Sequence, residues 1–328
     1  MSVEQTRQPE RQGERVSVDL SVVVPILDEA DSLDELVKEI IGGAAAAGRS
    51  LEIVLVDDGS RDGSWAKIQE LSQALPDTVY GIRFKRNYGK SAALAAGFRQ
   101  AQGDYIITMD ADLQDDPSEI KVLVEALDAG NDLVSGWKRD RKDPFTKTVP
   151  SRFFNFVTRK MSGIPLHDFN CGLKAYRSEV TTDLLLYGEM HRYIPLLAKW
   201  EGFDRITELQ VNHRPRKYGQ TKFGLERFVR GFLDLITVLF ITRFAARPMH
   251  FFGTLGTISF LGGFALSLYL TIDKLVFDNP IGDRPLLLLG VILILLGSQL
   301  FMSGILGEML IRQRVETHGS YHIVDRTR

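Results

Sequence analysis

Two long uncharged stretches near the C-terminus constrain the fold more than any other feature of the sequence. They are residues 251–272 and 286–307, each 22 residues long and without a charged side chain. At a rise of 1.5 Å per residue, a helix of this length covers about 33 Å, enough for a bilayer core of about 30 Å. A buried soluble helix is seldom so uniformly apolar, so the sequence predicts two transmembrane helices. Small residues recur in both stretches and favour close helix contact.

The charges that flank these stretches predict an orientation. Arg247 precedes the first stretch and Arg312 follows the second, whereas the connecting loop 273–285 is short and slightly acidic. The positive-inside rule then predicts a multi-pass protein of the inner or plasma membrane, with its remaining parts in the cytoplasm. Segment 227–248 is apolar but carries charges, so we expect an interfacial amphipathic helix there; a third span is the alternative.

The remaining composition excludes several classes of protein. The net charge of −2 gives no global attraction to nucleic acid, and the single cysteine, Cys171, allows no intrachain disulfide. Residues 1–16 are almost without apolar side chains, so we expect a disordered tail and not a signal peptide. Residues 17–226 are the expected catalytic domain, and 311–328 the expected cytoplasmic tail.

Residues 17–135 alternate between apolar runs and helical patterns. Strands are predicted at 20–25, 51–56, 79–84, 105–109 and 133–135, and helices at 31–47, 64–75, 91–101 and 117–129. Such alternation is typical of an α/β, Rossmann-like domain with a mostly parallel sheet and helices on both faces. The glycine patterns of dinucleotide-binding and P-loop proteins are missing, which argues against a dehydrogenase or a P-loop NTPase.

An acidic pair follows the fourth predicted strand. Asp110 and Asp112 are two residues apart, so in extended backbone they point to the same side. Two ionised carboxylates side by side repel each other unless a cation lies between them, and such oxygen ligands suit Mg²⁺ or Mn²⁺. The pair therefore predicts a divalent metal site at the carboxyl end of the sheet. A solvated acidic turn is the alternative.

Polar residues also follow the other predicted strands. Asp28 and Glu29 follow the first, Asp58 the second, and Asn87 and Lys90 the third. Because the carboxyl ends of parallel strands share one rim, we expect these groups to face a common ligand. Carboxylates there can accept hydrogen bonds from a nucleobase or a ribose. Capping and turn chemistry is the alternative, and it accounts well for Asp31 and Ser60.

Four of these motifs occur in an order that resembles the signature of a known family. They are Pro-Ile-Leu-Asp-Glu at 25–29, Val-Asp-Asp-Gly-Ser at 56–60, Arg-Asn-Tyr-Gly-Lys at 86–90 and Asp-Ala-Asp-Leu-Gln at 110–114. They resemble inverting glycosyltransferases of family 2, which have the GT-A fold. The rest of the chain resembles the polyisoprenyl-phosphate subgroup, which is related to dolichyl-phosphate mannose synthase.

This resemblance implies roles for individual residues. Asp110 and Asp112 would hold the metal on the donor diphosphate, and Gln114 would lie near the sugar; Asp112 and Gln114 thus belong to the catalytic set. Lys138 or Arg139 would neutralise donor phosphate, although a solvated basic loop is the alternative. The implied nucleotide-sugar ligands are Pro25, Asp28, Glu29, Asp58, Lys90, Asp110, Lys138 and Arg139.

The middle of the chain provides the expected acceptor region. Segment 152–161 predicts a basic amphipathic helix, either on a membrane surface or facing the core. Segment 167–177 resembles the acceptor-side loop of the family, which places Asp168 in the catalytic set near the acceptor. Its role as a base or an orienting group stays open, because a phosphate nucleophile, with a second pKa of about 6, is already a dianion near neutral pH. In the cationic segment 211–222, the expected phosphate ligands are Arg214, Arg216 and Lys222; positive flanking charge is the alternative.

The resulting hypothesis is a Mg²⁺- or Mn²⁺-dependent enzyme. It would transfer a hexose, with inversion, from a nucleotide sugar to undecaprenyl- or dolichyl-type polyprenyl phosphate at the cytoplasmic membrane face. UDP-glucose is the best guess for the donor, and GDP-mannose is the alternative. A non-catalytic membrane adaptor is a rival, as is a processive polysaccharide synthase, which would normally show Gln-x-x-Arg-Trp and more spans. A homo-oligomer is left as an option.

Overall fold

A computed structural model of the chain describes residues 18–139, 155–215 (without 157, 161, 183 and 185), 248–280 (without 279) and 285–318, with 311–318 as backbone alone. Two compact units divide the chain, Met1–Leu235 and Ile236–Arg328, and each is described by itself. The predicted tail 1–16, nearly all of the interfacial segment 227–248, and the predicted phosphate ligands Arg216 and Lys222 lie outside the described residues.

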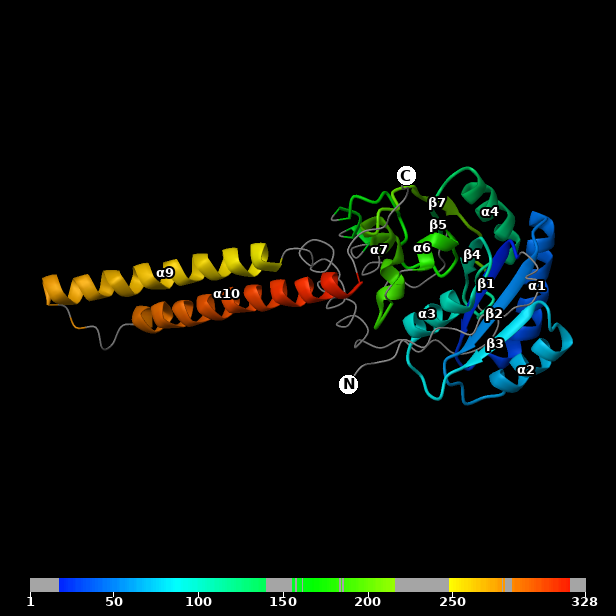
Figure 1. Cartoon of the computed structure of the whole chain (residues 1–328), viewed down its shortest axis with the longest axis horizontal. Coiled ribbons are helices and arrows are strands. Elements are labelled where there is room, and N and C mark those ends of the chain that lie inside the picture. The colour runs from blue at the N-terminus through cyan, green and yellow to red at the C-terminus, as the bar shows by residue number, and fades with distance from the viewer. Residues whose placement is uncertain are drawn as a thin grey trace. The chain divides into compact units, whose positions relative to one another are not determined.

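A seven-stranded sheet forms the centre of the first unit, in the order β3-β2-β1-β4-β6-β5-β7 (Figure 1). The strands are β1 Leu20–Ile26, β2 Leu51–Asp57, β3 Val79–Arg83, β4 Tyr105–Thr108, β5 Leu133–Trp137, β6 Lys174–Arg177 and β7 Ile206–Gln210. Strand β6 runs antiparallel to its neighbours β4 and β5, and the other pairings are parallel. The predicted mostly parallel α/β sheet is therefore confirmed.

Helices connect the strands. They are α1 Leu33–Ala47, α2 Ser64–Ala74, α3 Lys90–Gln100, α4 Ile120–Asp128, α6 Ser178–Thr182 and α7 Ile194–Trp200, with short 3₁₀ turns η1 Ala30–Ser32, η2 Pro117–Glu119 and η3 Met190–Tyr193. The N-cap residue of α1 is Ser32, and its side chain does not cap the helix. Residues 30–32 form the η1 turn, and the Ser32 hydroxyl donates backwards to the Glu29 carbonyl at 2.9 Å, so no cap hydrogen bond forms.

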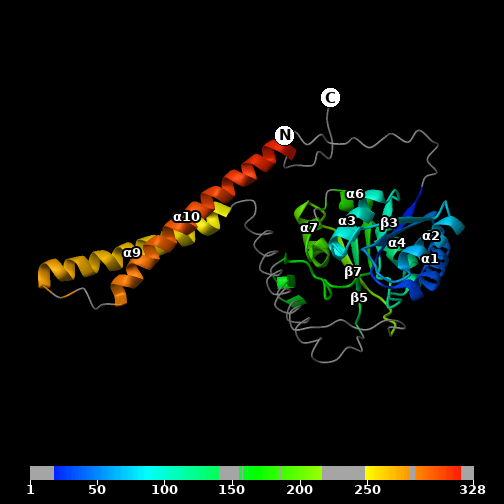
Figure 2. The ribbon, with the colours of Figure 1, turned by 90° about the horizontal axis from the view of Figure 1, so that it is seen from below.

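Alternation along β1 sends its side chains to opposite faces of the sheet. Val22 and Val24 belong to the core cluster with Leu36 of α1, on the face that α1 shares with α2 and α4. Val23 points the other way and meets Gly97 of α3, where any side chain would collide with it. Figures 1 and 2 show α1 and α3 on opposite sides of the sheet. The domain therefore has three layers, which leaves the strand ends open as a rim.

Strand β1 contains a proline, Pro25, at a position where the sheet needs no N–H donor. The pairing of β1 with β4 stops at Val23 and Thr108, and the Val23 carbonyl accepts the last contact, from the Met109 N–H at 3.4 Å. Pro25 has the same orientation as Val23 but lies beyond the end of β4. Its missing N–H therefore costs the sheet no hydrogen bond.

Two long helices form the described part of the second unit. Helix α9 spans Pro248–Phe277 and α10 spans Pro285–His318, and they pack side by side (Figures 1 and 2). Glycines make the close contact possible, since a Cβ atom at Gly263 would lie 2.5 Å from the Gly290 carbonyl oxygen.

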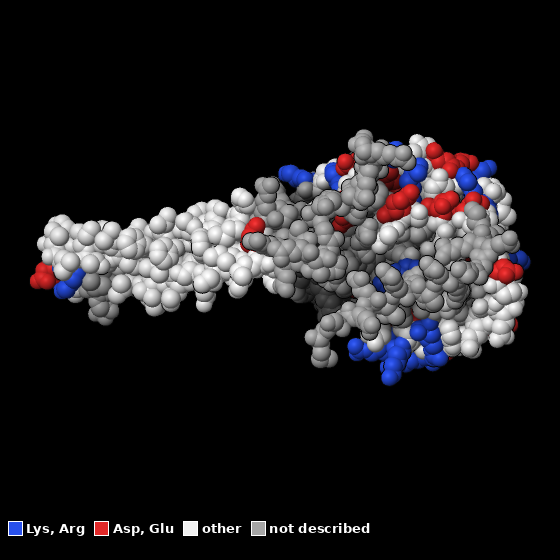
Figure 3. Space-filling model, in the orientation of Figure 1, with Lys and Arg blue, Asp and Glu red and all other residues white. Residues whose placement is uncertain are grey.

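Both helices are long and apolar enough to cross a membrane. The most apolar 18-residue stretches of these helices have mean hydropathies of 1.7 and 2.4, and only 17% and 11% of the residues in them are buried. Figure 3 shows a long uncharged surface over them. A core helix of a soluble protein would be mostly buried, and these are not. The two predicted apolar helices are confirmed.

Candidate active site

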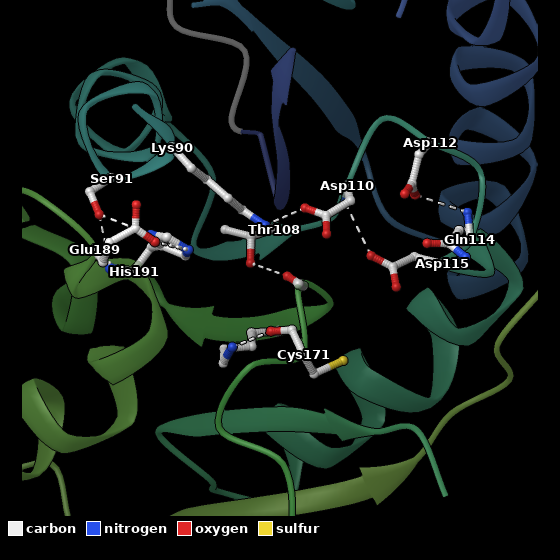
Figure 4. A network of polar contacts seen from close by, with 12 residues as sticks. Lys90, Ser91, Thr108, Asp110, Asp112, Gln114, Asp115, Cys171, Glu189 and His191 are labelled. Carbon is white, nitrogen blue, oxygen red and sulfur yellow. Dashed lines mark hydrogen bonds and ion pairs between the residues drawn. The ribbon is translucent and has the colours of Figure 1, made fainter. Parts of the chain in front are cut away.

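The acidic pair lies on a turn beyond the central sheet. Strand β4 ends at Thr108, and the backbone turns through Asp110, Asp112 and Leu113, whose φ is 59°. The expectation that the two carboxylates point the same way in extended backbone is therefore wrong. Figure 4 shows the Asp110 carboxylate directed at Lys90, whereas an Asp112 oxygen accepts from the Gln114 N–H at 3.2 Å.

A lysine and a glycine enclose the Asp110 carboxylate. Lys90, the first residue of α3, donates from its ammonium to Asp110 Oδ1 in an ion pair. A Cβ atom at Gly172 would lie 2.6 Å from Asp110 Oδ2 and 2.9 Å from Oδ1. Burial raises the pKa of Asp110, but the positive charges of Lys90 and Lys138 outweigh it and hold that pKa well below its usual range. Asp110 is therefore ionised at neutral pH.

A buried ion pair supports the backbone of the same turn. Asp115 Oδ1 lies 2.7 Å from the Lys138 ammonium, and these side chains are 1% and 10% exposed. The other oxygen of Asp115 accepts from the Asp110 N–H at 3.1 Å. Burial lowers the pKa of Lys138, but the charge of Asp115 more than reverses this and keeps the pKa above its ordinary value. Sequence reasoning assigned no role to Asp115, because its partner is a distant residue that no local pattern indicates.

Two further residues near Asp110 were also missed. Lys174 of β6 is 3% exposed and donates to the Cys171 carbonyl, and burial lowers its pKa. The ring of His191 lies 3.1 Å from the Ser91 hydroxyl. Burial and the nearby Lys90 lower the pKa of His191 to about 2, so this ring is neutral.

Burial raises the pKa of the Cys171 thiol to about 12, which leaves it protonated and unreactive.

A pocket of about 800 Å³ opens at the ends of β1, β2 and β3. Its polar and charged lining comprises Asp28, Ser60, Asn87, Arg61, Arg83, Lys85 and Arg86. Asp28 adopts a φ of 56°, and its carboxylate accepts from the Arg61 N–H at 2.8 Å, which fixes the loop at one wall. The pocket is large enough for a nucleotide and offers both hydrogen-bond acceptors and cations.

Asp58 joins two of the predicted motifs. It is 4% exposed, and its two oxygens accept from the N–H groups of Tyr88 and Gly89 at 2.7 and 2.9 Å. Burial raises the pKa of this carboxyl, and the two amide donors oppose that rise. Asp58 thus ties the 86–90 loop to the end of β2. Glu29 lies beside the pocket on the β1 side, where its N–H donates to the Ser64 hydroxyl at 3.0 Å.

Asp168 lies in the loop that leads into β6. It is 3% exposed, its carboxylate accepts from the Asn170 N–H at 3.0 Å, and its charge acts on Lys174. At the surface nearby, the rings of Trp137 and His167 stack at 4.4 Å. The Arg139 guanidinium lies over the Trp137 ring, 5.8 Å from its centre.

Arg214 has carboxylate partners within the protein. The Arg214 guanidinium contacts Glu39 at 2.7 Å and Asp116 at 2.8 Å. The backbone N–H of Arg214 donates to the Gln114 carbonyl at 3.0 Å. These contacts attach the segment after β7 to α1 and to the acidic turn. The role of Arg214 as a phosphate ligand stays a prediction.

The donor set at the turn fits a divalent cation that shares its ligands with a phosphate group. Asp110 supplies an ionised oxygen that already pairs with a cation, the Lys90 ammonium. Among the described residues, no three His, Cys, Asp or Glu side chains are grouped so that they could hold a metal by themselves. A metal here would take its remaining ligands from a diphosphate and water, as Mg²⁺ and Mn²⁺ do at nucleotide sites.

Comparison with known proteins connects this geometry to a family. The family model described as glycosyl transferase family 2 matches residues 21–185. Dodecaprenyl-phosphate galacturonate synthase of Rhizobium johnstonii is 40% identical over 301 residues, which cover 90% of this chain and 88% of that protein. Undecaprenyl-phosphate 4-deoxy-4-formamido-L-arabinose transferase of Edwardsiella ictaluri is 37% identical over 295 residues, 89% of each chain.

A solved structure supports the fold. Glucosyl-3-phosphoglycerate synthase from Mycobacterium tuberculosis, in complex with Mn²⁺ and UDP-glucose, aligns with a TM-score of 0.52 and 21% identity. The alignment covers 69% of this chain and 79% of that one. The sheet and its flanking helices therefore have the GT-A fold, as the sequence motifs predicted.

Proposed function

The chain belongs to glycosyl transferase family 2, and from that premise we propose that this glycosyltransferase moves a sugar from a nucleoside diphosphate sugar to a polyprenyl phosphate. The observation that carries the proposal is the extent of similarity to two polyprenyl-phosphate sugar transferases. It reaches 90% and 89% of this chain, which is more than the sheet domain alone. The two apolar helices would hold the enzyme at the membrane, where such an acceptor resides.

The proposed donor site combines the 800 Å³ pocket with the acidic turn. The base and ribose would lie at the ends of β1 and β2, surrounded by Pro25, Asp28, Glu29 and Asp58. The donor phosphates would lie toward the cationic side chains Lys90, Lys138 and Arg139. Gln114 would lie at the sugar, next to Asp112. A Mg²⁺ or Mn²⁺ ion bound at Asp110 and Asp112 would neutralise charge on the diphosphate.

The proposed reaction is a single displacement. An oxygen of the acceptor phosphate forms a bond to the anomeric carbon, while the bond from that carbon to the diphosphate breaks and its electron pair leaves with the nucleoside diphosphate. Attack from the face opposite the leaving group inverts the anomeric centre. A phosphate dianion has no proton to lose, so no general base is required. We therefore assign Asp168, which is buried and hydrogen-bonded in its own loop, an orienting role.

The identity of the sugar stays a prediction. UDP-glucose is the donor that the family resemblance suggests, and GDP-mannose is the alternative. The two relatives are named for galacturonate and for 4-deoxy-4-formamido-L-arabinose. The pocket and the turn are proposed to face the cytoplasm at the inner or plasma membrane, in accord with the charges that flank α9 and α10.

Sugar transfer by the full-length chain in lipid nanodiscs tests the proposal. The purified protein would be given a short polyprenyl phosphate and, in separate reactions, UDP-glucose, GDP-mannose, UDP-galacturonate and a UDP-linked formamido-arabinose. We expect a polyprenyl-phosphate sugar from one donor, and its loss with EDTA or in Asp112→Asn. The surface variant Asp77→Asn removes a distant exposed carboxylate and should retain activity. A chain that turns over no donor, or an Asp112→Asn variant as active as wild type under chelation, would contradict the proposal.

A further inference from the structure

We propose that Lys90 is an internal counter-cation: in the ligand-free protein it occupies the cation-binding oxygen of Asp110, and it must leave when a metal and a nucleotide bind. The inference rests on the proposed function only in treating Asp110 as a metal ligand. It assigns Lys90 a second role, as a competitor of the metal, beyond the contact with the donor that the sequence predicts.

One oxygen of Asp110 already has a cation as its partner. Gly172 leaves space beside the carboxylate, since a Cβ atom there would lie 2.6 Å from Oδ2 and 2.9 Å from Oδ1. Oδ1 is held by the Lys90 ammonium (Figure 4). The ammonium is carried by a side chain with four rotatable bonds, so it can move away when another cation arrives. A cation that reaches Oδ1 must therefore displace Lys90.

The other buried lysines near Asp110 are committed elsewhere. Lys138 is paired with Asp115, and its side chain is 10% exposed. Lys174 is 3% exposed and donates to the Cys171 carbonyl. The Lys90 side chain is 30% exposed and extends from the first residue of α3. Of these three cations, Lys90 is the one with room to swing toward solvent or toward a bound anion.

This arrangement couples metal binding to nucleotide binding. A metal that arrives alone must release the ammonium into water, which forfeits the ion pair with Asp110. A metal that arrives with a diphosphate offers the displaced ammonium a new anionic partner. The nucleotide therefore favours the state in which Lys90 has left Asp110, and by linkage the metal gains affinity for the protein when nucleotide is bound.

Mn²⁺ binding without nucleotide tests the inference directly. The full-length protein in nanodiscs would be titrated with Mn²⁺, and free Mn²⁺ would be followed by electron paramagnetic resonance. Lys90→Met and Lys90→Gln remove the competing charge and should bind Mn²⁺ about tenfold more tightly than wild type. A neighbouring positive charge typically shifts the pKa of a carboxylate by about one unit or more, and one unit corresponds to a factor of about ten in affinity. Lys90→Arg keeps the cation and should resemble wild type. Lys67→Met removes a distant lysine paired with Asp34 and Glu70, and it should also resemble wild type.

The same variants should have the opposite effect on UDP binding. In the presence of Mn²⁺, Lys90→Met and Lys90→Gln should bind UDP more weakly than wild type, because the displaced ammonium no longer meets the diphosphate. If Lys90 only bound phosphate, the neutral variants would have the same Mn²⁺ affinity as wild type. If Lys90 only stabilised the turn, the neutral variants would bind Mn²⁺ more weakly than wild type. Either result would overturn the inference.

One control separates this inference from the proposed metal site. If Asp110→Asn abolishes Mn²⁺ binding while both neutral Lys90 variants match wild type, the competition is wrong and the metal site stands. If neither wild type nor any Lys90 variant binds Mn²⁺, and UDP does not change this, both the competition and the metal role of Asp110 are wrong.

Discussion

Gly172 lies directly against the carboxylate of Asp110, so that a Cβ atom on residue 172 would be 2.6 Å from Oδ2 and 2.8 Å from Cγ. The contact joins the loop before β6 to the acidic turn after β4. The Thr108 hydroxyl strengthens the junction by donating to the Gly172 carbonyl at 2.9 Å. A residue far along the chain thus fixes where the Asp110 carboxylate can be.

We expect Gly172→Ala to impair sugar transfer much more than stability. The added methyl group must push the Asp110 carboxylate aside, and a displacement of about 1 Å at a reacting centre can cost about 10²-fold in rate. Transfer assays and Mn²⁺ titration of the full-length protein would measure it. The matched control is Gly42→Ala on α1, where an added Cβ meets nothing within 4 Å. Equal activity of the two variants would show that the contact does not position Asp110.

The Asp115–Lys138 pair should behave as a buried ion pair whose halves depend on each other. Lys138→Met leaves the carboxylate of Asp115 buried without its cation, which typically costs about 3–5 kcal/mol. The double variant Asp115→Leu with Lys138→Met removes both charges, so its melting temperature should exceed the value expected from adding the two single effects. Strict additivity of the three melting temperatures would contradict this coupling. Because Asp115 also accepts from the Asp110 N–H, the double variant should stay impaired in sugar transfer.

His191 should make the protein sensitive to acid. Burial and Lys90 lower the pKa of this ring to about 2, from an ordinary 6.5. Between about pH 2 and 6.5 the unfolded chain binds a proton at His191 and the folded chain does not. The free energy of unfolding therefore keeps its full value above pH 6.5 and falls as the pH drops below 6.5. One proton corresponds to at most about 1.4 kcal/mol per pH unit.

Melting temperatures from pH 7.5 to 5 would measure this effect in wild type and in His191→Gln. The glutamine can keep a hydrogen bond to Ser91 but does not titrate. We expect a smaller fall in melting temperature for the variant than for wild type. Parallel curves would mean that other groups cause the acid sensitivity.

Adjacent glycines on α9 should respond differently to the same substitution. A Cβ atom at Gly263 would lie 2.5 Å from the Gly290 carbonyl oxygen, whereas one at Gly262 would meet nothing within 4 Å. Gly263→Leu should separate α9 from α10 and lower the melting temperature in nanodiscs, with a cost of about 1–3 kcal/mol for overpacking. Gly262→Leu should be tolerated. If both variants melt together with wild type, the two helices do not depend on this contact.

The sequence alone determined the features that depend on neighbours in the chain. The order of strands and helices from Leu20 to Trp137, the two apolar helices and the rim of polar strand ends were all predicted, because hydrophobic periodicity and turn residues are local signals. The family motifs added the GT-A fold in the same way.

Tertiary structure alone decided how the site is assembled. The turn after β4 parts the carboxylates of Asp110 and Asp112, and the antiparallel insertion of β6 between β4 and β5 brings the loop with Gly172 to the acidic turn. The pairing of Lys90 with Asp110, and of Arg214 with Glu39, likewise joins residues that no local pattern relates. Hydrophobic periodicity indicates which face of a helix or strand is buried. It does not indicate which charged groups meet, because that depends on the path of the whole chain. Distant segments supply the space and the opposite charge that each charged side chain finds around it.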